Sequence, residues 1–510
     1  MEKKNTWSSR TTFILAAVGS AVGLGNAWRF PGLCAKHGGG SFILVYVVSM
    51  LIIGLPLLMM EVSIGRKSHQ GAAGAFRSLN PRLEPIGWMA TANAFFIVAY
   101  YAIVFAWVLI MIPGSLQFAH MTGDSAAAST VFENLIQTTW DVVDYRIPPQ
   151  MLVAFLVAWG SIYYCIRDGA SSVGKVVKYT VFLPVLLLAV MAIKGLFMPG
   201  ALDGMKMLFI PNMSALADPS LWVDAVGQTF YSLSIMMAIM FAYGSYLHKT
   251  TNLMVDCGVI ALSSIAVSVL SGIVMFSTMG GVGMLDDFSA SGVATAFVIY
   301  PQAIVNLTNS GIFNALFGIA FYLMLVTLAI DSAFSIVEGV SCSVSARFGW
   351  NAKRVTRIIC LVAAAVSVIF ITRAGLAWLD IVDHWANQVT LILIGVFECI
   401  AIGWCFNLNK VYHQVCLKAE RLRMPRWWFF GCIRFVSPAL LAVLFAWNMI
   451  DLFVNQGGHY GYAGWAEFIG GWLVCIIVFA SGFIIPAIIK KKNLPDNVDP
   501  HIWDDAEKDE

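Results

Sequence analysis

A carboxylate stands in the middle of an otherwise apolar stretch, in the sequence Leu328-Ala329-Ile330-Asp331-Ser332. A charge at the centre of a membrane-spanning helix is costly unless it is paired or bound to an ion. The Asp331 carboxylate and the Ser332 hydroxyl are hard oxygen groups that suit a small, hard cation. The pattern therefore indicates a cation site, with a structural salt bridge as the alternative.

Two more acids, Glu61 and Glu398, also lie within apolar stretches. Each carboxylate is able to accept hydrogen bonds from backbone amides that a broken helix leaves without partners. We expect them to support such a break from behind. A proton relay or a buried polar network is the alternative.

Two apolar stretches are interrupted by glycine and polar residues. The first interruption runs from Gly19 to Pro31 and includes Gly23, Gly25 and Asn26, and the second runs from Gly227 to Ser234. Unwound backbone exposes carbonyl oxygens that replace the water around a cation, and the half-helix ends add dipole charge. The two stretches stand five spans apart, which is typical of an inverted repeat with two broken helices. Close packing of intact helices through small residues is the alternative.

Along the chain, twelve apolar stretches are long enough to span a bilayer. They predict an all-α polytopic membrane protein with a 5+5 inverted repeat, broken spans 1 and 6, and two additional spans. The stretches are 12–36, 41–66, 88–114, 150–166, 176–196, 222–247, 254–280, 313–345, 355–372, 376–406, 432–454 and 465–489.

The composition agrees with a membrane protein. Of the 510 residues, 59% are hydrophobic and 12% are charged, against about 25% charged in soluble domains. This excludes a disordered chain and a disulfide-stapled secreted scaffold. The net charge of +2 argues against a nucleic-acid partner. Motifs of zinc sites, ATPases and serine hydrolases are missing from the sequence, so we expect no enzyme.

The basic residues predict the orientation. Most of the 31 Lys and Arg lie in loops on the side of the two termini, which places both termini in the cytoplasm and the protein in the inner or plasma membrane. One transporter-like domain, 1–510, divides into a first half (1–196), a second half (197–406), the last two spans (407–490) and a tail (491–510). We expect the acidic end of the tail, Asp496–Glu510, to be mobile, and the sequence assigns it no role.

Several motifs taken together resemble the neurotransmitter:sodium symporter family over nearly the whole chain. They are the run Gly19–Pro31, His37-Gly38-Gly39-Gly40-Ser41-Phe42, Gly54-Leu55-Pro56, Glu61-Val62-Ser63-Ile64-Gly65-Arg66, Tyr100-Tyr101, Gly227–Ser234, and Asp331-Ser332 with Glu338-Gly339. The resemblance implies Na⁺-coupled import of an amino acid, or a related small solute, by alternating access.

The resemblance also implies two sodium sites. The second site would use the carbonyls of Gly19, Val22 and Leu328 and the side chains of Asp331 and Ser332. The first would use the Ala21 carbonyl, Asn26, Ser232 and a position in span 7. That position is an asparagine in the family and Ser264 here, so we expect a complete second site and a weakened first one.

The pocket implied by the resemblance favours a neutral amino acid. Gly23 stands where amine-transporting relatives have an acid, and it leaves room for a substrate carboxylate. Tyr101 would donate its hydroxyl to that carboxylate. The remaining lining would be Ser20, Ala21, Ile97, Tyr231, Ser232, Ser234, Met237, Ser332 and Ile336.

Closure of the outer side would use Arg29 and Asp383, under a lid of Tyr101 and Tyr231. On the inner side, Lys4 or Arg10 would supply the base, but the family's acid position is Ala346 here. We therefore expect the inner closure to rely on Trp7, Ser245 and Tyr246.

A chloride site is a further hypothesis from the resemblance. Tyr46, Gln228, Ser232 and Ser268 stand where chloride-dependent relatives contact the anion, and position 268 carries no acid. A serine hydroxyl that only packs between helices is the alternative.

A second functional class stays open. The altered inner closure, Ser264 and the glycine-poor sixth span are compatible with a substrate-binding sensor or a channel on the same scaffold, without coupled flux. Concentrative uptake of a small amino-acid-like substrate into a lipid-bilayer compartment would separate the two.

Overall fold

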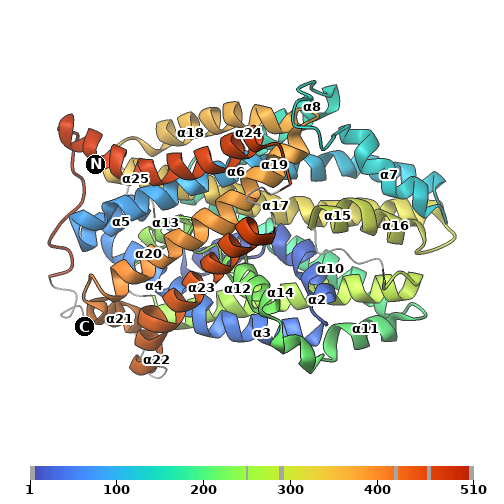
Figure 1. Ribbon diagram of the computed structural model, residues 1–510, viewed down its shortest axis with the longest axis horizontal. Helices are drawn as coiled ribbons and strands as arrows, with labels where there is room; N and C mark the ends of the chain where they lie inside the picture. The colour runs from blue at the N-terminus through green and yellow to red at the C-terminus, as the bar shows by residue number, and fades with distance from the viewer. Residues whose placement is uncertain (1–5, 249–250, 287–291, 418–422, 456–460, 505–510) are drawn as a thin grey trace.

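The computed structural model describes residues 6–248, 251–286, 292–417, 423–455 and 461–504. Within these ranges the regular structure is helical, and the one β contact is an isolated bridge between Gly39 and Pro211. The long helices run side by side along the long axis of the molecule (Figure 1). The all-α polytopic prediction is confirmed.

Ten helices in the described ranges are long and apolar enough to cross a membrane. They are α3–α4 (Gly40–Ser49, Leu55–Ser68), α6 (Glu84–Gly114), α8 (Pro149–Ile166), α9–α10 (Ala170–Thr180, Phe182–Leu196), α14 (Leu253–Val282), α17 (Gly311–Phe348), α18 (Ala352–Ser367), α19–α20 (Gly375–Asp383, Ile392–Gly403), α22–α23 (Arg426–Gly431, Ser437–Ile450) and α24–α25 (Gly464–Glu467, Leu473–Lys491). Shorter helices connect them: α5 (Ala72–Leu79), α7 (Ser125–Ile136), α11 (Ala201–Phe209), α15 (Gly292–Ala294), α16 (Tyr300–Val305) and α21 (Leu408–Cys416).

The expected count of twelve spans is not reached by length and composition. A bent pair, Arg10–Ala21 and Gly25–Lys36, meets at 51° and brings the count in the described ranges to eleven. The expected sixth span, 222–247, is broken as predicted, into two short helices, α12 (Pro219–Leu233) and α13 (Ile239–Ser245). Each of these is shorter than a bilayer-spanning helix of about 20 residues.

The first break separates α1 (Arg10–Ala21) from a π-helical turn, Gly25–Arg29, and α2 (Phe30–Lys36). Val22 leaves the helical region, with φ −99° and ψ 80°. The Asn26 side chain then accepts a hydrogen bond from the Gly23 amide at 3.3 Å. Because glycine disfavours helix and Asn26 supplies a local acceptor, the sequence itself stops the helix here.

The second break, Ser234–Ala238, forms without glycine. Ser234, Met236 and Ala238 have φ of 51°, 64° and 61°, a region that costs about 1–2 kcal/mol per non-glycine residue. Two long-range hydrogen bonds support the break: Ser234 Oγ donates to the Ser20 carbonyl at 2.8 Å, and the Met236 amide donates to Glu61 Oε1 at 2.7 Å. The sixth span therefore breaks although it is poor in glycine, because these tertiary contacts hold its backbone in the broken conformation.

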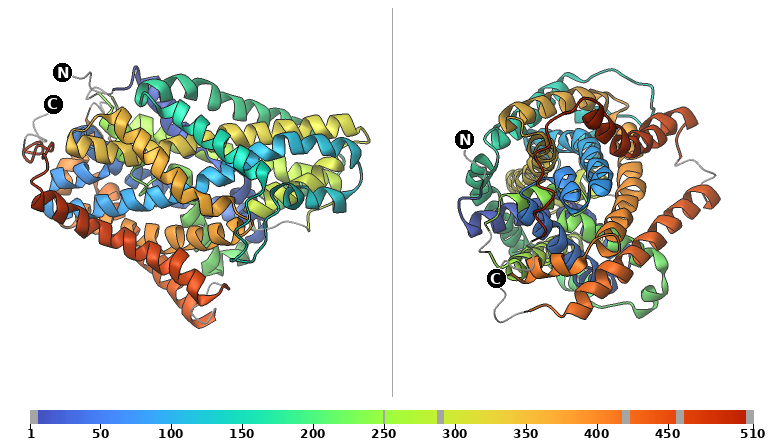
Figure 2. Two further views of the ribbon diagram at one scale, coloured as in Figure 1. Left: turned by 90° about the horizontal axis from the view of Figure 1, so that it is seen from above. Right: turned by 90° about the vertical axis from the view of Figure 1, so that its left-hand side faces the viewer.

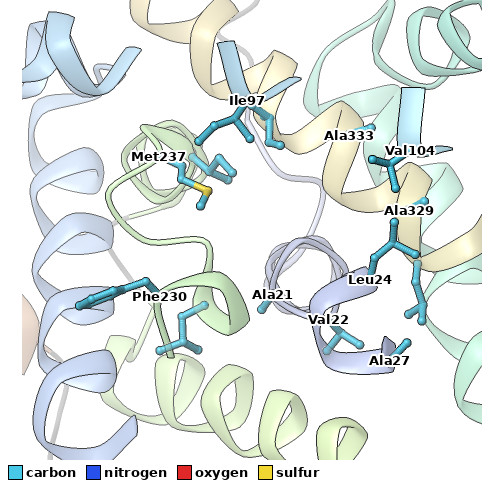
Figure 3. Packing of buried hydrophobic residues seen from close by; sticks show 14 of the residues in the cluster. Ala21, Val22, Leu24, Ala27, Ile97, Val104, Phe230, Met237, Ala329 and Ala333 are labelled. Atoms are coloured by element: carbon cyan, nitrogen blue, oxygen red, sulfur yellow. The ribbon is translucent and has the colours of Figure 1, made fainter. Parts of the chain in front are cut away.

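The two breaks lie together, between α6 and α17. Figure 3 shows Ala21, Val22 and Leu24 of the first break near Phe230 and Met237 at the second, with Ile97 of α6 and Ala329 and Ala333 of α17 around them. The helix α17 runs alongside α6 and also contacts α1.

Both ends of the described chain lie at one end of the molecule (Figure 2). The tail, expected to be mobile, is docked as far as it is described: Val498 and Trp503 are buried. The expectation is wrong for residues 496–504, because these side chains find apolar and charged partners on the helix ends. Residues 505–510 lie outside the described ranges.

Candidate binding site

A cavity of about 380 Å³ lies between the two breaks, α6 and α17. Most of the predicted pocket residues line it: Ser20, Gly23, Ile97, Tyr101, Tyr231, Ser234, Met237, Ser332 and Ile336. Ala21 and Ser232 do not; both are fully buried behind its wall. The volume lies within the usual range for small-molecule sites.

Two hydroxyl groups in the lining of this cavity lack partners within the described ranges. The hydroxyls of Ser20 and Tyr101 are buried and have no hydrogen-bond partner among the described residues. Buried polar groups are normally paired, so these two are available to a ligand. A Cβ atom at Gly23 would lie 2.5 Å from Ser332 Oγ, so any side chain at position 23 would occupy the space where these groups converge.

A second, much smaller cavity of about 10 Å³ lies beside the first break. Gly19, Val22, Leu328 and Asp331 line it, as do Thr180 and Val181 at the junction of α9 and α10. Its size is close to that of one water molecule or one small ion. Thr180 and Val181 were missed in the sequence, because nothing local marks them as neighbours of residue 331.

The charge of this small cavity is unbalanced. Asp331 Oδ1 is buried and has no hydrogen-bond partner in the described part of the chain. A Cβ atom at Gly19 would lie 2.6 Å from Asp331 Oδ2, so glycine lets the carboxylate approach the α1 backbone. Ser332, also predicted for this site, lines the large cavity instead, and its hydroxyl donates to the Leu328 carbonyl at 3.4 Å; the hydroxyl residue of the small cavity is Thr180. Backbone carbonyls, a carboxylate and a hydroxyl are a fitting oxygen set for Na⁺ at an unwound helix.

The four residues of the other predicted ion site also converge. Ser264 Oγ donates to the Ser232 carbonyl at 2.8 Å and lies 3.5 Å from the Ala21 carbonyl oxygen. Asn26 Nδ2 lies 3.0 Å from Ser264 Oγ. The short serine side chain therefore stands among the very groups that would surround the ion.

The predicted chloride residues form one hydroxyl and amide cluster that continues from this site. The hydroxyls of Tyr46 and Ser268 lie 3.3 Å apart, and Gln228 Nε2 donates to Ser232 Oγ at 3.3 Å. Asn26 Nδ2 donates to Ser268 Oγ at 2.8 Å. In the described ranges no carboxylate hydrogen-bonds to these side chains, so the cluster presents donors without a competing anion.

Arg29 and Asp383, the two residues expected to close the outer side and here called the outer pair, do not form an ion pair. The Arg29 guanidinium stacks over the Tyr231 ring at 4.7 Å, and Asp383 accepts from Asn387 Nδ2 at 2.7 Å. The described residues show no ion pair between Arg29 and Asp383. The large cavity continues past both side chains to Asp380 and His384, so the site is open on this side.

The opposite side is closed, by more groups than the sequence indicated. Trp7 Nε1 donates to the Tyr243 carbonyl at 2.9 Å, and the Trp7 ring meets Tyr246 edge-on. Tyr246 donates its hydroxyl to Glu338. Of the expected gating residues, Lys4 lies outside the described ranges and Ser245 is buried beside Cys342.

The acid that pairs with Arg10 is Asp256, in the first turn of α14, at 2.6 Å. This residue was missed because it lies 246 positions away in the sequence. An aspartate in the first turn of a helix does not indicate a distant arginine partner, because aspartate at that position already stabilises the helix by itself.

The two remaining acids lie behind the second break. Glu61 Oε1 accepts the Met236 amide, while Glu61 Oε2 and both Glu398 oxygens have no partner among the described residues. Both side chains are fully buried.

Comparison with known proteins places these features in a family. The model of the sodium:neurotransmitter symporter family matches residues 4–130 and 145–494. A sodium-dependent transporter of Methanocaldococcus jannaschii is 31% identical over 96% of this chain and 98% of its own length. The sodium- and chloride-dependent GABA transporter 2 of Rattus norvegicus is 27% identical, over 95% and 86%, and the sodium- and chloride-dependent taurine transporter of that species is 28% identical, over 93% and 83%.

Proposed function

This chain belongs to the sodium:neurotransmitter symporter family, and on that premise we propose that it imports a neutral amino acid, or a related small solute with a carboxylate, by alternating access. Sodium-coupled transport is the family's activity, and the chain is a transporter rather than an enzyme. It spans the membrane many times. The substrate, the coupling sites and the orientation, with both termini in the cytoplasm, belong to the proposal.

One observation carries the coupling. The small cavity at Asp331 and the large cavity lie on the same two segments, because different residues of 19–25 and of α17 line each of them. An ion that neutralises Asp331 removes the cost of a buried, unpaired carboxylate. It also draws the first break toward α17, where Ser332 faces the substrate cavity. Sodium binding therefore pre-organises the pocket.

The inner part of the large cavity supports a neutral substrate side chain. Ile97, Met237 and Ile336 provide an apolar wall, and the free hydroxyls of Ser20 and Tyr101 lie where a carboxylate would bind. The names of the relatives, which are GABA and taurine transporters, agree with a small amino-acid-like solute.

The closed inner side and the parted outer pair support a direction for the cycle. Sodium and substrate enter from the side of Arg29 and Asp383, which then approach each other and cover the site. Release follows when the contacts of Trp7, Arg10 and Tyr246 separate. A membrane potential of 100 mV adds about 2.3 kcal/mol for each net charge carried inward.

We further propose that the cluster of Tyr46, Gln228, Ser232 and Ser268 holds chloride. Its support is the set of donors without a neighbouring carboxylate, together with two relatives that are named as chloride-dependent transporters. Replacement of chloride by gluconate on both sides of the membrane should then reduce Na⁺-driven uptake. Uptake at the full rate in gluconate would exclude an obligatory chloride.

The deciding experiment uses the full chain in proteoliposomes. Labelled neutral amino acids, GABA and taurine are offered with an inward Na⁺ gradient, and with K⁺ in place of Na⁺ as the control. We expect accumulation of one compound class only with the Na⁺ gradient. Saturable binding without accumulation would instead favour a sensor. The serine at position 264 of the first ion site is compatible with that alternative.

A further inference from the structure

Two arginines share one glutamate at the inner ends of three helices. Arg347, near the end of α17, pairs with Glu84 at the start of α6 at 2.8 Å, and Arg77 of α5 pairs with Glu84 at 2.8 Å. The side chains of Arg347 and Glu84 are only 1% and 2% exposed. This group of three charges is left with one excess positive charge, which is unfavourable where water is excluded.

The tail supplies the missing negative charge. Asp496 pairs with Arg347 at 3.1 Å, and Arg77 donates to the Asp496 carboxylate from two nitrogens, Nε at 2.9 Å and Nη2. The result is a network of two positive and two negative charges. Forked contacts between an arginine and a carboxylate are among the stronger ion pairs.

Neighbouring residues of the tail bind further elements. Asn497 Nδ2 donates to the Ala346 carbonyl at 3.0 Å, and the Asn497 carbonyl accepts from Gln70 Nε2 at 3.1 Å. Trp503, 2% exposed, donates to Ser78 Oγ at 3.0 Å and packs edge-on against Phe406. Residues 494–504, here called the C-terminal strap, thus join α17, α5 and the segment after α20.

The strap lies at the end of the helix that carries the site. Asp331 and Ser332 of α17 line the cavities, Glu338 accepts from Tyr246, and Cys342 lies 3.6 Å from Ser245. Any outward movement of this end of α17 from α5 must separate Asp496 from Arg77 or from Arg347. The match to the family model stops at residue 494, so most of the strap lies beyond it.

We infer that the C-terminal strap opposes opening of the inner side, with Asp496 as the positioning residue that completes the charge network between α5 and α17. The inference rests on the proposed alternating access. Undocking of the strap would increase the time that the inner side is open, without a change in any residue that contacts ion or substrate.

The test measures reaction of the native Cys342 with N-ethylmaleimide in the full-length protein in nanodiscs, read by mass spectrometry of its peptide. Cys342 is buried under Ser245 and Tyr246, so its labelling rate reports inner opening. In Asp496→Asn we expect labelling in Na⁺-free buffer to rise about two- to fivefold, the range for the loss of one partly exposed ion pair. Trp503→Ala should act in the same direction.

The matched control is Asp504→Asn. It removes the same charge from the same strap, but among the described residues the Asp504 side chain pairs with His501 alone. Its labelling rate should therefore equal that of the wild type. Equal rates in Asp496→Asn, Trp503→Ala and the control would overturn the inference. The labelling assay requires no transport, so its result tests the strap alone. A failure of Na⁺-driven uptake by the wild type in proteoliposomes would count against the proposed function instead.

Discussion

At the scale of single residues, the unpaired carboxylate of Asp331 has the clearest consequence. It faces a cavity that fits one small ion, with carbonyls of the first break around it. In Asp331→Asn the attraction for a cation is lost while the size and the burial are kept. We expect Na⁺-dependent uptake to fall by at least about tenfold, which corresponds to about 1.4 kcal/mol of lost ion binding, with normal insertion. Asp203→Asn, on the surface, is the control, and an unchanged Na⁺ dependence in Asp331→Asn would refute the sodium assignment.

Gly23 carries a second prediction at this scale. A Cβ atom there would meet Ser332 Oγ at 2.5 Å, in the space assigned to the substrate carboxylate. Gly23→Ala should weaken substrate binding about tenfold or more, because one added methyl group displaces an anchoring group. Equilibrium binding of labelled substrate measures it. Gly160→Ala on α8, where a Cβ atom would meet nothing within 4 Å, should bind as the wild type does.

At the scale of elements, the second break is the unusual feature, because alanine and methionine hold left-handed backbone in it. Ala238 has φ 61°, so Ala238→Gly should relieve strain and stabilise the protein by about 1 kcal/mol. The same substitution inside α13, Ala242→Gly, should destabilise it by about as much. Thermal unfolding in detergent compares the two. Shifts of the same sign would contradict the account of the break.

The strap is also an element, and its docking should depend on pH. The ion pairs with Arg77 and Arg347 outweigh the effect of burial and hold the pKa of Asp496 below its ordinary value of 3.8. A lowered pKa means that docking favours the carboxylate. Docking is therefore complete at neutral pH and weakens as the pH falls through the pKa of the docked form, below 3.8.

Fluorine NMR of 5-fluorotryptophan at Trp503 follows this release. Asp496→Asn should remove the part of the pH dependence that belongs to Asp496. A Trp503 signal with the same pH dependence in both proteins would show that Asp496 does not control docking.

At the scale of the whole molecule, the cavity is open past Arg29 and Asp383 and closed at Trp7 and Tyr246. A cysteine in place of Gln388, which lines the open part, should react quickly with an impermeant thiol reagent from the outer side. Sodium and substrate together should slow this labelling, because the outer pair closes over the site. Labelling at one constant rate in all conditions would show that no such closure occurs.

Much of this protein could be read from local sequence. Polar residues within apolar stretches are conspicuous because a bilayer excludes unpaired charge, so Asp331 and the run Gly19–Pro31 marked the site without a structure. The long apolar stretches likewise indicated the all-α membrane fold. Each of these signals lies within one helix, where hydrophobicity and spacing are sufficient.

The remaining features depend on partners that are distant in the sequence. The second break needs Glu61 and the Ser20 carbonyl, Arg10 needs Asp256, and the tail needs Arg77 and Arg347. The local sequence around Asp496 predicts a side chain in water, and only the packing of the tail brings it to Arg77 and Arg347. Local composition therefore decided which segments are apolar enough to cross the membrane and where the polar groups of the proposed ion site stand. Tertiary contacts decided how the second break forms and what closes the inner side.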